Sequence, residues 1–285
     1  MSIVEVVLRV PAEREEDAIA HLAEFSPGGF RSDPIPAAGV VEFGVFVDAD
    51  VAATVEAYLV RAGVPVSSSH VVDVPEDWNE KWKEFHKAVL IGELWVGPPW
   101  LAHEIPASGY RPVVIEPGQG FGTGAHPTTH LMLALLQAQP RSGVLDVGCG
   151  SGVLAVAAAL LGFGPIEAID NDPVAIEATV DNLKRNNVEA LVKVRLVDAE
   201  RDALPRADLV LANLTLEPLR GVATKVNAAR VIVSGLLRSQ VDTAEAVFSE
   251  YGYVLRERRD REGWVALVLD SVDTENAAMR NKLVF

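Results

Sequence analysis

The clearest candidate for chemistry is Val144-Leu-Asp-Val-Gly-Cys-Gly-Ser-Gly152, an apolar run that leads into a glycine-rich turn. Glycines in such a turn let the backbone approach a ligand closely. Dinucleotide-binding turns follow the spacing G-x-G-x-x-G, whereas Gly148, Gly150 and Gly152 are separated by single residues. A carboxylate such as Asp146 at the mouth of the turn would repel a pyrophosphate but attract an ammonium group, such as that of a bound methionine moiety. The alternative is a turn that serves helix–strand packing alone.

Three more polar residues follow apolar runs further along the chain. Asp170 ends the next run about twenty residues after the glycine turn, where an acidic side chain can accept both hydroxyls of a ribose. Asp198 could accept from an adenine amine, and capping of the next turn explains it equally well. Asn213 could orient the ligand or an incoming amine, or it could only cap the next helix. Because ligands bind at the carboxyl edge of parallel sheets, we expect Asp146 and these three side chains to lie close together.

A second glycine-rich loop, Glu116-Pro-Gly-Gln-Gly-Phe-Gly-Thr-Gly-Ala-His-Pro-Thr-Thr-His130, enters a helix. It lacks the lysine of a phosphate-binding loop, which argues against a nucleoside triphosphate. His126 and His130 have the spacing of a zinc pair, but no Glu follows the first and no third ligand is evident, so no metal site is expected. Thr128 and Thr129 are expected to offer hydroxyls to the ligand from the helix start.

Strands and helices alternate from Leu131 onward, which predicts a doubly wound, mostly parallel α/β sheet of Rossmann type with helices on both faces. The last two strands lie close enough in sequence to form an antiparallel pair. Strands are expected at 143–147, 166–170, 192–197, 209–213, 230–234, 253–259 and 264–270, with helices at 131–139, 154–161, 173–186 and 217–226 and another that ends at Tyr251.

Residues 1–75 predict a separate, small α+β domain with the element order βαββαβ. Pro75 ends this unit, and 76–88 is predicted as a linker helix because Trp78, Trp82 and Phe85 share one helical face. The second domain then spans 89–285. Its first part, up to Glu116, contains short apolar segments that could not be assigned, and 271–285 is expected to be a polar tail.

Composition limits the class of protein. The chain has 285 residues, 49% of them hydrophobic, and its longest apolar stretch is far shorter than the roughly 20 residues of a membrane span. With its single cysteine, these features predict a cytoplasmic, globular protein. A net charge of −15 argues against direct nucleic-acid binding and favours a basic partner. Residues 1–75 carry four Arg, no Lys and twelve Asp or Glu. A merely soluble acidic surface is the alternative.

Together these motifs resemble the PrmA family, the bacterial methyltransferases of ribosomal large-subunit protein eleven. The resemblance covers nearly the whole chain, and its most specific part is the loop Phe121 to Thr129. It also includes 76–85, the turn from Asp146 to Gly152, Asp170 to Pro173, and Asn213 with Pro218 and Leu219.

The resemblance implies a class I methyltransferase fold, S-adenosylmethionine as cofactor, and methylation of lysine and amino-terminal amines of a ribosomal protein that the first domain recognises. Matched motif by motif, the family's cofactor contacts fall on Thr129, Gly148, Asp170 and Asn213, beside the Asp146, Gly150 and Asp198 expected from the residues themselves. Leu214 and Thr215 depart from the family pattern, which puts acceptor specificity in doubt. Three alternatives remain: another substrate for the same fold, a noncatalytic cofactor-binding protein, and, least favoured because of Asp146, a dehydrogenase.

Overall fold

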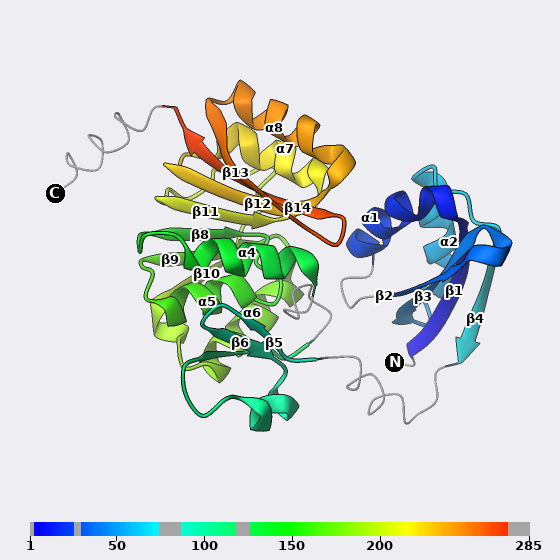
Figure 1. Ribbon diagram of the computed structural model, residues 1–285, viewed down its shortest axis with the longest axis horizontal. Helices are drawn as coiled ribbons and strands as arrows, with labels where there is room; N and C mark the ends of the chain where they lie inside the picture. The colour runs from blue at the N-terminus through cyan, green and yellow to red at the C-terminus, as the bar shows by residue number, and fades with distance from the viewer. Residues whose placement is uncertain (1–2, 26–29, 74–86, 118–125, 273–285) are drawn as a thin grey trace. The chain divides into compact units, whose positions relative to one another are not determined.

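The computed structural model describes residues 3–25, 30–73, 87–117 and 126–272 (Figure 1). The chain divides into two compact units, Met1–Phe85 and His86–Phe285. The predicted linker helix lies almost wholly outside the described residues, and so do its aromatic residues and the centre of the second glycine-rich loop. The proposed domain limits at 75 and 89 therefore stay predictions.

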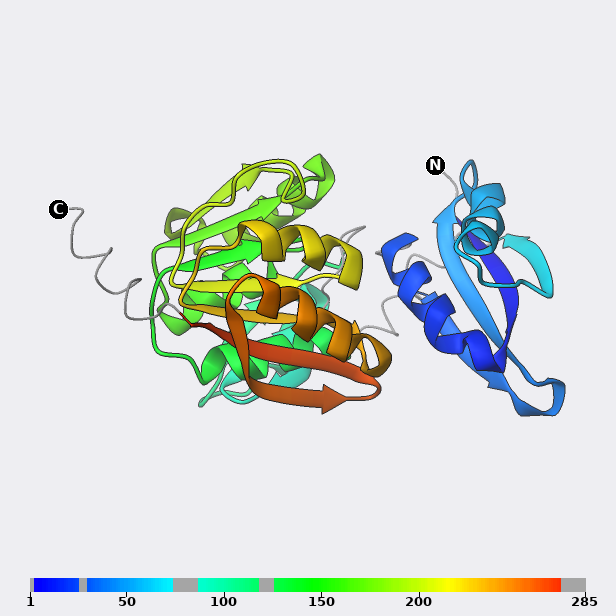
Figure 2. The same cartoon turned by 90° about the horizontal axis from the view of Figure 1, so that it is seen from above.

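The first unit is a four-stranded antiparallel sheet with two helices on one face, in the predicted βαββαβ order (Figure 2). The strands run in the order β2-β3-β1-β4 across the sheet. The sequence analysis did not locate β2, because its arginine, aspartate and proline hide the strand pattern. In chain order the elements are β1 (Ile3–Pro11), α1 (Glu15–Phe25), β2 (Phe30–Ile35), β3 (Val40–Asp48), α2 (Ala52–Arg61) and β4 (Ser68–Asp73).

The core of the first unit lies between the sheet and its helices. Alternate residues of β1 and β3, such as Leu8 and Phe43, point to this side and are fully buried. They pack with Leu22 from α1 and with Val55 and Leu59 from α2. Because each such side chain contributes about 1.5–3 kcal/mol when buried, the period-two pattern of the two strands sets which face the helices cover.

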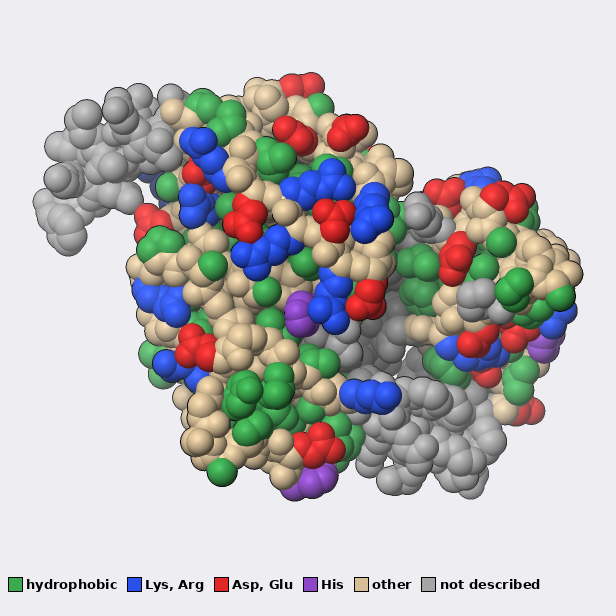
Figure 3. All heavy atoms as spheres, in the orientation of Figure 1, with side chains coloured by type: hydrophobic (Ala, Val, Ile, Leu, Met, Phe, Trp, Pro, Cys, Tyr) green, Lys and Arg blue, Asp and Glu red, His purple; other side chains and the backbone are tan. Residues whose placement is uncertain are grey.

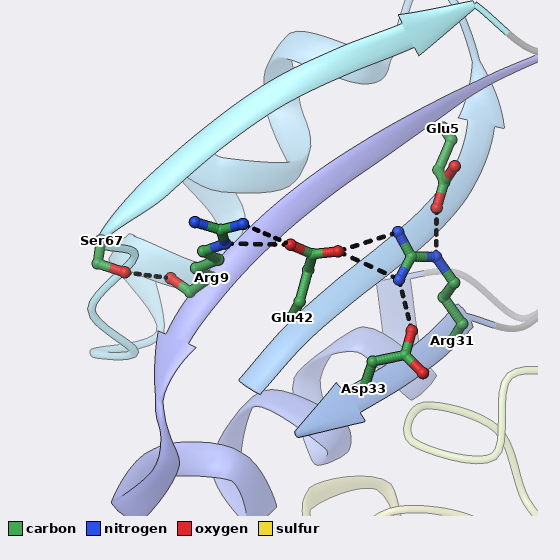
Figure 4. Close-up of polar contacts among 6 residues, drawn as sticks. All are labelled: Glu5, Arg9, Arg31, Asp33, Glu42 and Ser67. Atoms are coloured by element: carbon green, nitrogen blue, oxygen red, sulfur yellow. Dashed lines mark hydrogen bonds and ion pairs between the residues drawn. The ribbon is translucent and has the colours of Figure 1, made fainter. Parts of the chain in front are cut away.

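The opposite face of this sheet carries a network of charges that crosses three strands (Figure 4). Glu42 on β3 lies between Arg9 on β1, with Arg9 Nε 3.0 Å from Glu42 Oε2, and Arg31 on β2, whose two Nη atoms lie 3.3 Å from Glu42 Oε1. Arg31 also donates to Glu5 (Nε to Oε1, 2.6 Å) and to Asp33. The bonds from Arg9 and Arg31 hold the pKa of Glu42 below its usual value. Both arginines are therefore neutralised within the unit.

The second unit contains a seven-stranded sheet in the order β10-β9-β8-β11-β12-β14-β13 (Figure 1). The first five strands in this order are parallel neighbours, and β14 and β13 close the sheet as an antiparallel pair. The doubly wound α/β prediction is thereby confirmed. The strands are β8 (Val144–Val147), β9 (Ile166–Asp170), β10 (Val192–Leu196), β11 (Leu209–Asn213), β12 (Arg230–Leu237), β13 (Tyr253–Arg261) and β14 (Trp264–Ser271).

Helices cover both faces of this sheet (Figures 1 and 2). On one face lie α4 (Pro127–Gln137), α5 (Val153–Leu161) and α6 (Pro173–Arg185), and on the other lie α7 (Leu216–Lys225) and α8 (Val241–Glu250). Helix α5 is apolar all round because it is enclosed between α4, α6, the large sheet and β7 (Arg111–Val114). No helix in the described part of the chain combines the length and apolar character that a membrane crossing requires.

The segment that the sequence left unassigned forms a separate three-stranded sheet, β5-β6-β7. Its strands β5 (Val89–Ile91) and β6 (Leu94–Gly97) are too short to show a periodic pattern. The fully buried Trp95 anchors β6. Strand β7 pairs in parallel with β6 and leads toward the second glycine-rich loop.

Both edges of the seven-stranded sheet carry cationic side chains. On β10, Arg195 lies 2.7 Å from Glu167 of the neighbouring strand. On β13, Arg256, Arg258 and Arg259 are paired with acidic residues on β13 and β14. Figure 3 shows basic and acidic side chains interspersed, with no large area of one sign, on the face of the second unit that it displays.

Candidate functional site

Three predicted site residues meet at the carboxyl edge of the seven-stranded sheet. Strand β8 lies between β9 and β11, and Val147 is in register with Ile169 on one side and Ala212 on the other. One position further along, Asp170 and Asn213 therefore flank Gly148. The sheet topology thus brings the two side chains to either side of the glycine turn, as the sequence predicted.

The three glycines of the turn share one backbone conformation. Gly148, Gly150 and Gly152 have φ angles of 70°, 53° and 77°, in the left-handed region that favours glycine. The Gly150 N–H donates to Asp170 Oδ2 at 2.9 Å, and the other oxygen of Asp170 accepts from the Asp172 N–H at 3.0 Å. Asp170 is therefore held with its carboxylate against the turn.

Asp146 on β8 has a buried carboxyl group, and 1% of the residue is exposed. Its Oδ2 accepts from the Ala155 N–H at 3.1 Å, near the start of α5, and its Oδ1 has no hydrogen-bond partner among the described residues. Burial raises the pKa of Asp146 from 3.8 to about 7, the bond from Ala155 opposes this rise, and the nearby Asp170 adds to it. A cation beside Oδ1 would stabilise the ionised carboxylate and so lower the pKa of Asp146.

Thr129 and Asn213 each hold a further buried oxygen, Thr129 Oγ1 and Asn213 Oδ1, without a partner in the described ranges. A buried polar atom without a partner costs about 1–3 kcal/mol. With Asp146 Oδ1, these atoms come from three different elements, and all belong to residues predicted for the site. They suit a ligand that offers hydrogen-bond donors.

The start of α4 is fixed by aromatic packing and hydrogen bonds. His126 caps the helix, its ring packs edge-on against Trp264 at 5.0 Å between centroids, and burial lowers its pKa to about 4. Its Nδ1 lies 2.7 Å from Thr128 Oγ1. His130 Nε2 lies 3.2 Å from an Arg261 nitrogen. Across the described residues, no group of three or more His, Cys, Asp or Glu side chains could hold a metal ion.

Asp198 lies at the same edge, beyond β10, and its carboxylate interacts with residues of the turn that follows it. Its Oδ1 accepts from the Glu200 N–H at 2.9 Å, and Oδ2 lies 3.4 Å from Arg201 Nε. An open depression with a volume of about 480 Å³ is lined by Asp198 and Asn171, with Leu196, Val197, Arg201 and Asp202. The turn-capping alternative is thus realised, and an adenine contact stays a prediction. Asp172 caps α6 by accepting from the Val174 N–H.

The sequence analysis did not identify the residues that contact the glycine turn from α6 and from the segment after β11. On α6, Thr179 donates to the Gly150 carbonyl at 2.9 Å, and Asn182 donates to the Ser151 carbonyl at 2.9 Å. After β11, the side chain of Leu214 lies so close to Gly148 that a Cβ there would overlap it. Periodicity marks Thr179 and Asn182 only as members of the buried face of α6, so no local signal could reveal their partners.

Comparisons with known proteins place these observations in a family. The family model described as ribosomal protein L11 methyltransferase (PrmA) matches residues 47–271. A protein of that name from Dechloromonas aromatica (strain RCB) is 34% identical over 266 residues, which cover 88% of each chain. Another from Thiobacillus denitrificans (strain ATCC 25259 / T1) is 36% identical over 231 residues, or 78% of this chain and 76% of its own.

A solved structure shows the same fold. It is the crystal structure of ribosomal protein L11 methylase from Lactobacillus delbrueckii subsp. bulgaricus, with a TM-score of 0.59 and 24% identity. The match covers 65% of this chain and 98% of that one. The family match extends over most of the chain and includes the glycine turn and the ends of β8, β9 and β11, and the resemblance seen in the sequence is confirmed. This chain belongs to the ribosomal protein L11 methyltransferase (PrmA) family.

Proposed function

We propose that this protein transfers methyl groups from S-adenosylmethionine to lysine or amino-terminal amines of ribosomal protein L11. The observation that carries the proposal is a set of three buried oxygens that have no partner among the described residues, on Asp146 of β8, Asn213 of β11 and Thr129 at the start of α4. The cofactor would offer an ammonium group to Asp146 and hydroxyl groups to Asp170. The names of the family and of its relatives supply the substrate.

When bound, the cofactor supplies a methyl group on a positively charged sulfur, which is open to attack by an amine. The chain then has to hold the amine in line with that methyl group, and such positioning supplies much of the rate in reactions of this kind. Asn213 Oδ1 and the Leu214 carbonyl are proposed to accept from the amine N–H groups. The Leu214 N–H donates to the Ser234 carbonyl at 3.1 Å, which fixes this segment to β12.

No dedicated base is assigned. A lysine amine has a reference pKa near 10.4 and must lose a proton before it attacks. Burial of that amine beside Asn213 would lower its pKa by desolvation. The amine would release its proton to solvent as it enters the site, and its lone pair would form the new N–C bond as the bond between the methyl carbon and sulfur breaks.

The first unit is proposed to recognise the substrate by charge. Its net charge over residues 1–75 is −8, from four Arg and twelve acidic residues. Arg9, Arg31 and Arg14 are each paired with carboxylates of the same unit. Among the described residues, exposed acids such as Glu13 and Glu56 make no ion pair, so they are open to a basic partner.

The test is transfer of labelled methyl from S-adenosylmethionine to a ribosomal protein extract, with the labelled band identified by mass spectrometry. We expect label on L11, on lysine or the amino terminus. Label on another protein would replace the proposed substrate, and tight cofactor binding without transfer would indicate a noncatalytic protein.

Electrostatic docking is tested by varying the salt concentration in the same assay. Because exposed charges separated by more than a Debye length of about 8 Å are screened at 0.15 M salt, the KM for L11 should rise between 0.05 and about 0.5 M salt. The affinity for the cofactor, measured without L11, serves as the control. A KM for L11 that does not change with salt would exclude docking by charge.

A further inference from the structure

Helix α6 presents a polar face to the site. Thr179, Asn182 and Asn186 follow one another at spacings of three and four residues, so they lie on one side of the helix or just beyond its end. Thr179 is 0% exposed and Asn182 is 1% exposed. Burying polar side chains on a helix costs folding free energy unless each side chain forms hydrogen bonds.

All three residues bind backbone groups outside α6, in irregular segments or, for Asn186, at the last residue of β7. The Asn182 side chain donates through Nδ2 to the Ser151 carbonyl and accepts at Oδ1 from the Glu116 N–H, each at 2.9 Å. Thr179 donates to the Gly150 carbonyl. Asn186 accepts from the Val114 N–H at 2.9 Å and donates to the Val114 carbonyl at 2.7 Å.

These bonds join two segments that are far apart in sequence. One is the glycine turn after β8, and the other is the end of β7, which leads into the second glycine-rich loop. Asn182 contacts both with one amide group. The ion pair of Arg185 Nη2 with Glu116 Oε2, at 3.0 Å, adds a further link from α6 to the second segment.

We propose that Asn182, together with Thr179, is a positioning residue that fixes the spacing between the glycine turn and the Glu116 segment for cofactor binding. The inference rests on the proposed function, since it takes S-adenosylmethionine as the ligand of this site. The geometry explains why an amide lies at this position. A leucine of similar size could fill the space but would remove the bonds to the Ser151 carbonyl and the Glu116 N–H.

The test compares Asn182→Ala with Leu183→Ala. Leu183 is the next residue on α6, is 1% exposed and makes none of these bonds, so its truncation weakens helix packing alone. The affinity for S-adenosylmethionine and for S-adenosylhomocysteine is measured by titration calorimetry well below the melting temperature of each variant. Because no protein substrate is present, the result stands whether or not the chain methylates L11.

We expect Asn182→Ala to weaken cofactor binding at least tenfold, which corresponds to about 1.4 kcal/mol, and Leu183→Ala to leave the affinity within twofold of wild type. Thr179→Val, a substitution of nearly equal volume that removes the hydroxyl and its bonds to the Gly150 carbonyl and to Cys149 Sγ, should weaken binding about threefold and keeps the test open if the alanine variant does not fold. Unchanged affinity in the polar variants, or an equal loss in Leu183→Ala, would overturn the proposal.

Discussion

Replacing Asp146 by Asn should stabilise the free protein at neutral pH while weakening cofactor binding. The folded state raises the pKa of this carboxyl group from 3.8 to about 7, chiefly by burial. The folded protein therefore binds the proton more tightly than the unfolded chain, so stability falls as pH rises from about 4 to 7. One pKa unit is worth about 1.4 kcal/mol, so the penalty at pH 7 and above is about 4 kcal/mol.

The substitution removes this penalty and adds a smaller one. Asn keeps an oxygen for the Ala155 N–H, but its amide nitrogen would occupy the place of Oδ1, which has no partner among the described residues. An unsatisfied donor there costs about 1–3 kcal/mol. The net gain at pH 8 is therefore about 2 kcal/mol, or a melting temperature higher by roughly 4–8 °C for a unit of this size.

The assay is thermal unfolding of both proteins at pH 8 and pH 5, with cofactor affinity measured alongside. The gain should shrink or reverse at pH 5, where the wild-type carboxyl is mostly protonated in the folded state. Cofactor affinity should fall by roughly tenfold or more, because the ammonium group loses its charged partner. Asp170→Asn, at a half-buried carboxylate that accepts two N–H bonds, should give no such gain. A variant at Asp146 that is no more stable than wild type at pH 8 would refute the reasoning.

Three further predictions concern other parts of the second unit. Asn213→Ala should lower kcat on the order of 10²-fold with a smaller change in KM for the cofactor, and unchanged turnover in a steady-state assay would exclude amine orientation by this amide. Gly235→Ala should lower both the melting temperature and kcat, because a Cβ there would overlap the Leu214 backbone, whereas Gly109→Ala, at a φ of 87° in open space, should show only the cost of the left-handed conformation. Asp270→Asn should lose less stability than wild type as the pH falls below about 4, because the bonds from Arg230 lower the pKa of Asp270 and their stabilisation is lost as the carboxylate is protonated.

The long elements of the second unit could be predicted because parallel strands buried on both faces appear as continuous apolar runs between amphipathic helices. Asp146, Asp170 and Asn213 could be grouped from the sequence because each lies at or near the end of such a run, and these ends share one edge of a parallel sheet. Strand β12 was predicted to end at Ser234 but continues to Leu237, since the register shift between Val233 and Leu236 interrupts its pattern.

Other features depend on partners that lie far away in the chain. Asn182 is 31 residues from Ser151 and 66 residues from Glu116, so nothing in the local sequence reveals that it joins them. The close approach of Leu214 to Gly148 is equally a product of strand order. Strand β2 escaped prediction because Arg31 and Asp33 are charged, and only their place in the sheet network explains them.

The charged side chains on the edge strands β10 and β13 of the seven-stranded sheet affect how the protein could associate with itself. An edge strand exposes unpaired N–H and C=O groups that can recruit a strand from another molecule. Arg195 on β10 and Arg256 and Arg258 on β13 are paired with carboxylates of their own or a neighbouring strand, so a strand that joined either edge would have to strip water from these charged pairs. Charged edge strands of this kind disfavour edge-to-edge pairing, which lets the chain keep an open sheet without closing it into a barrel.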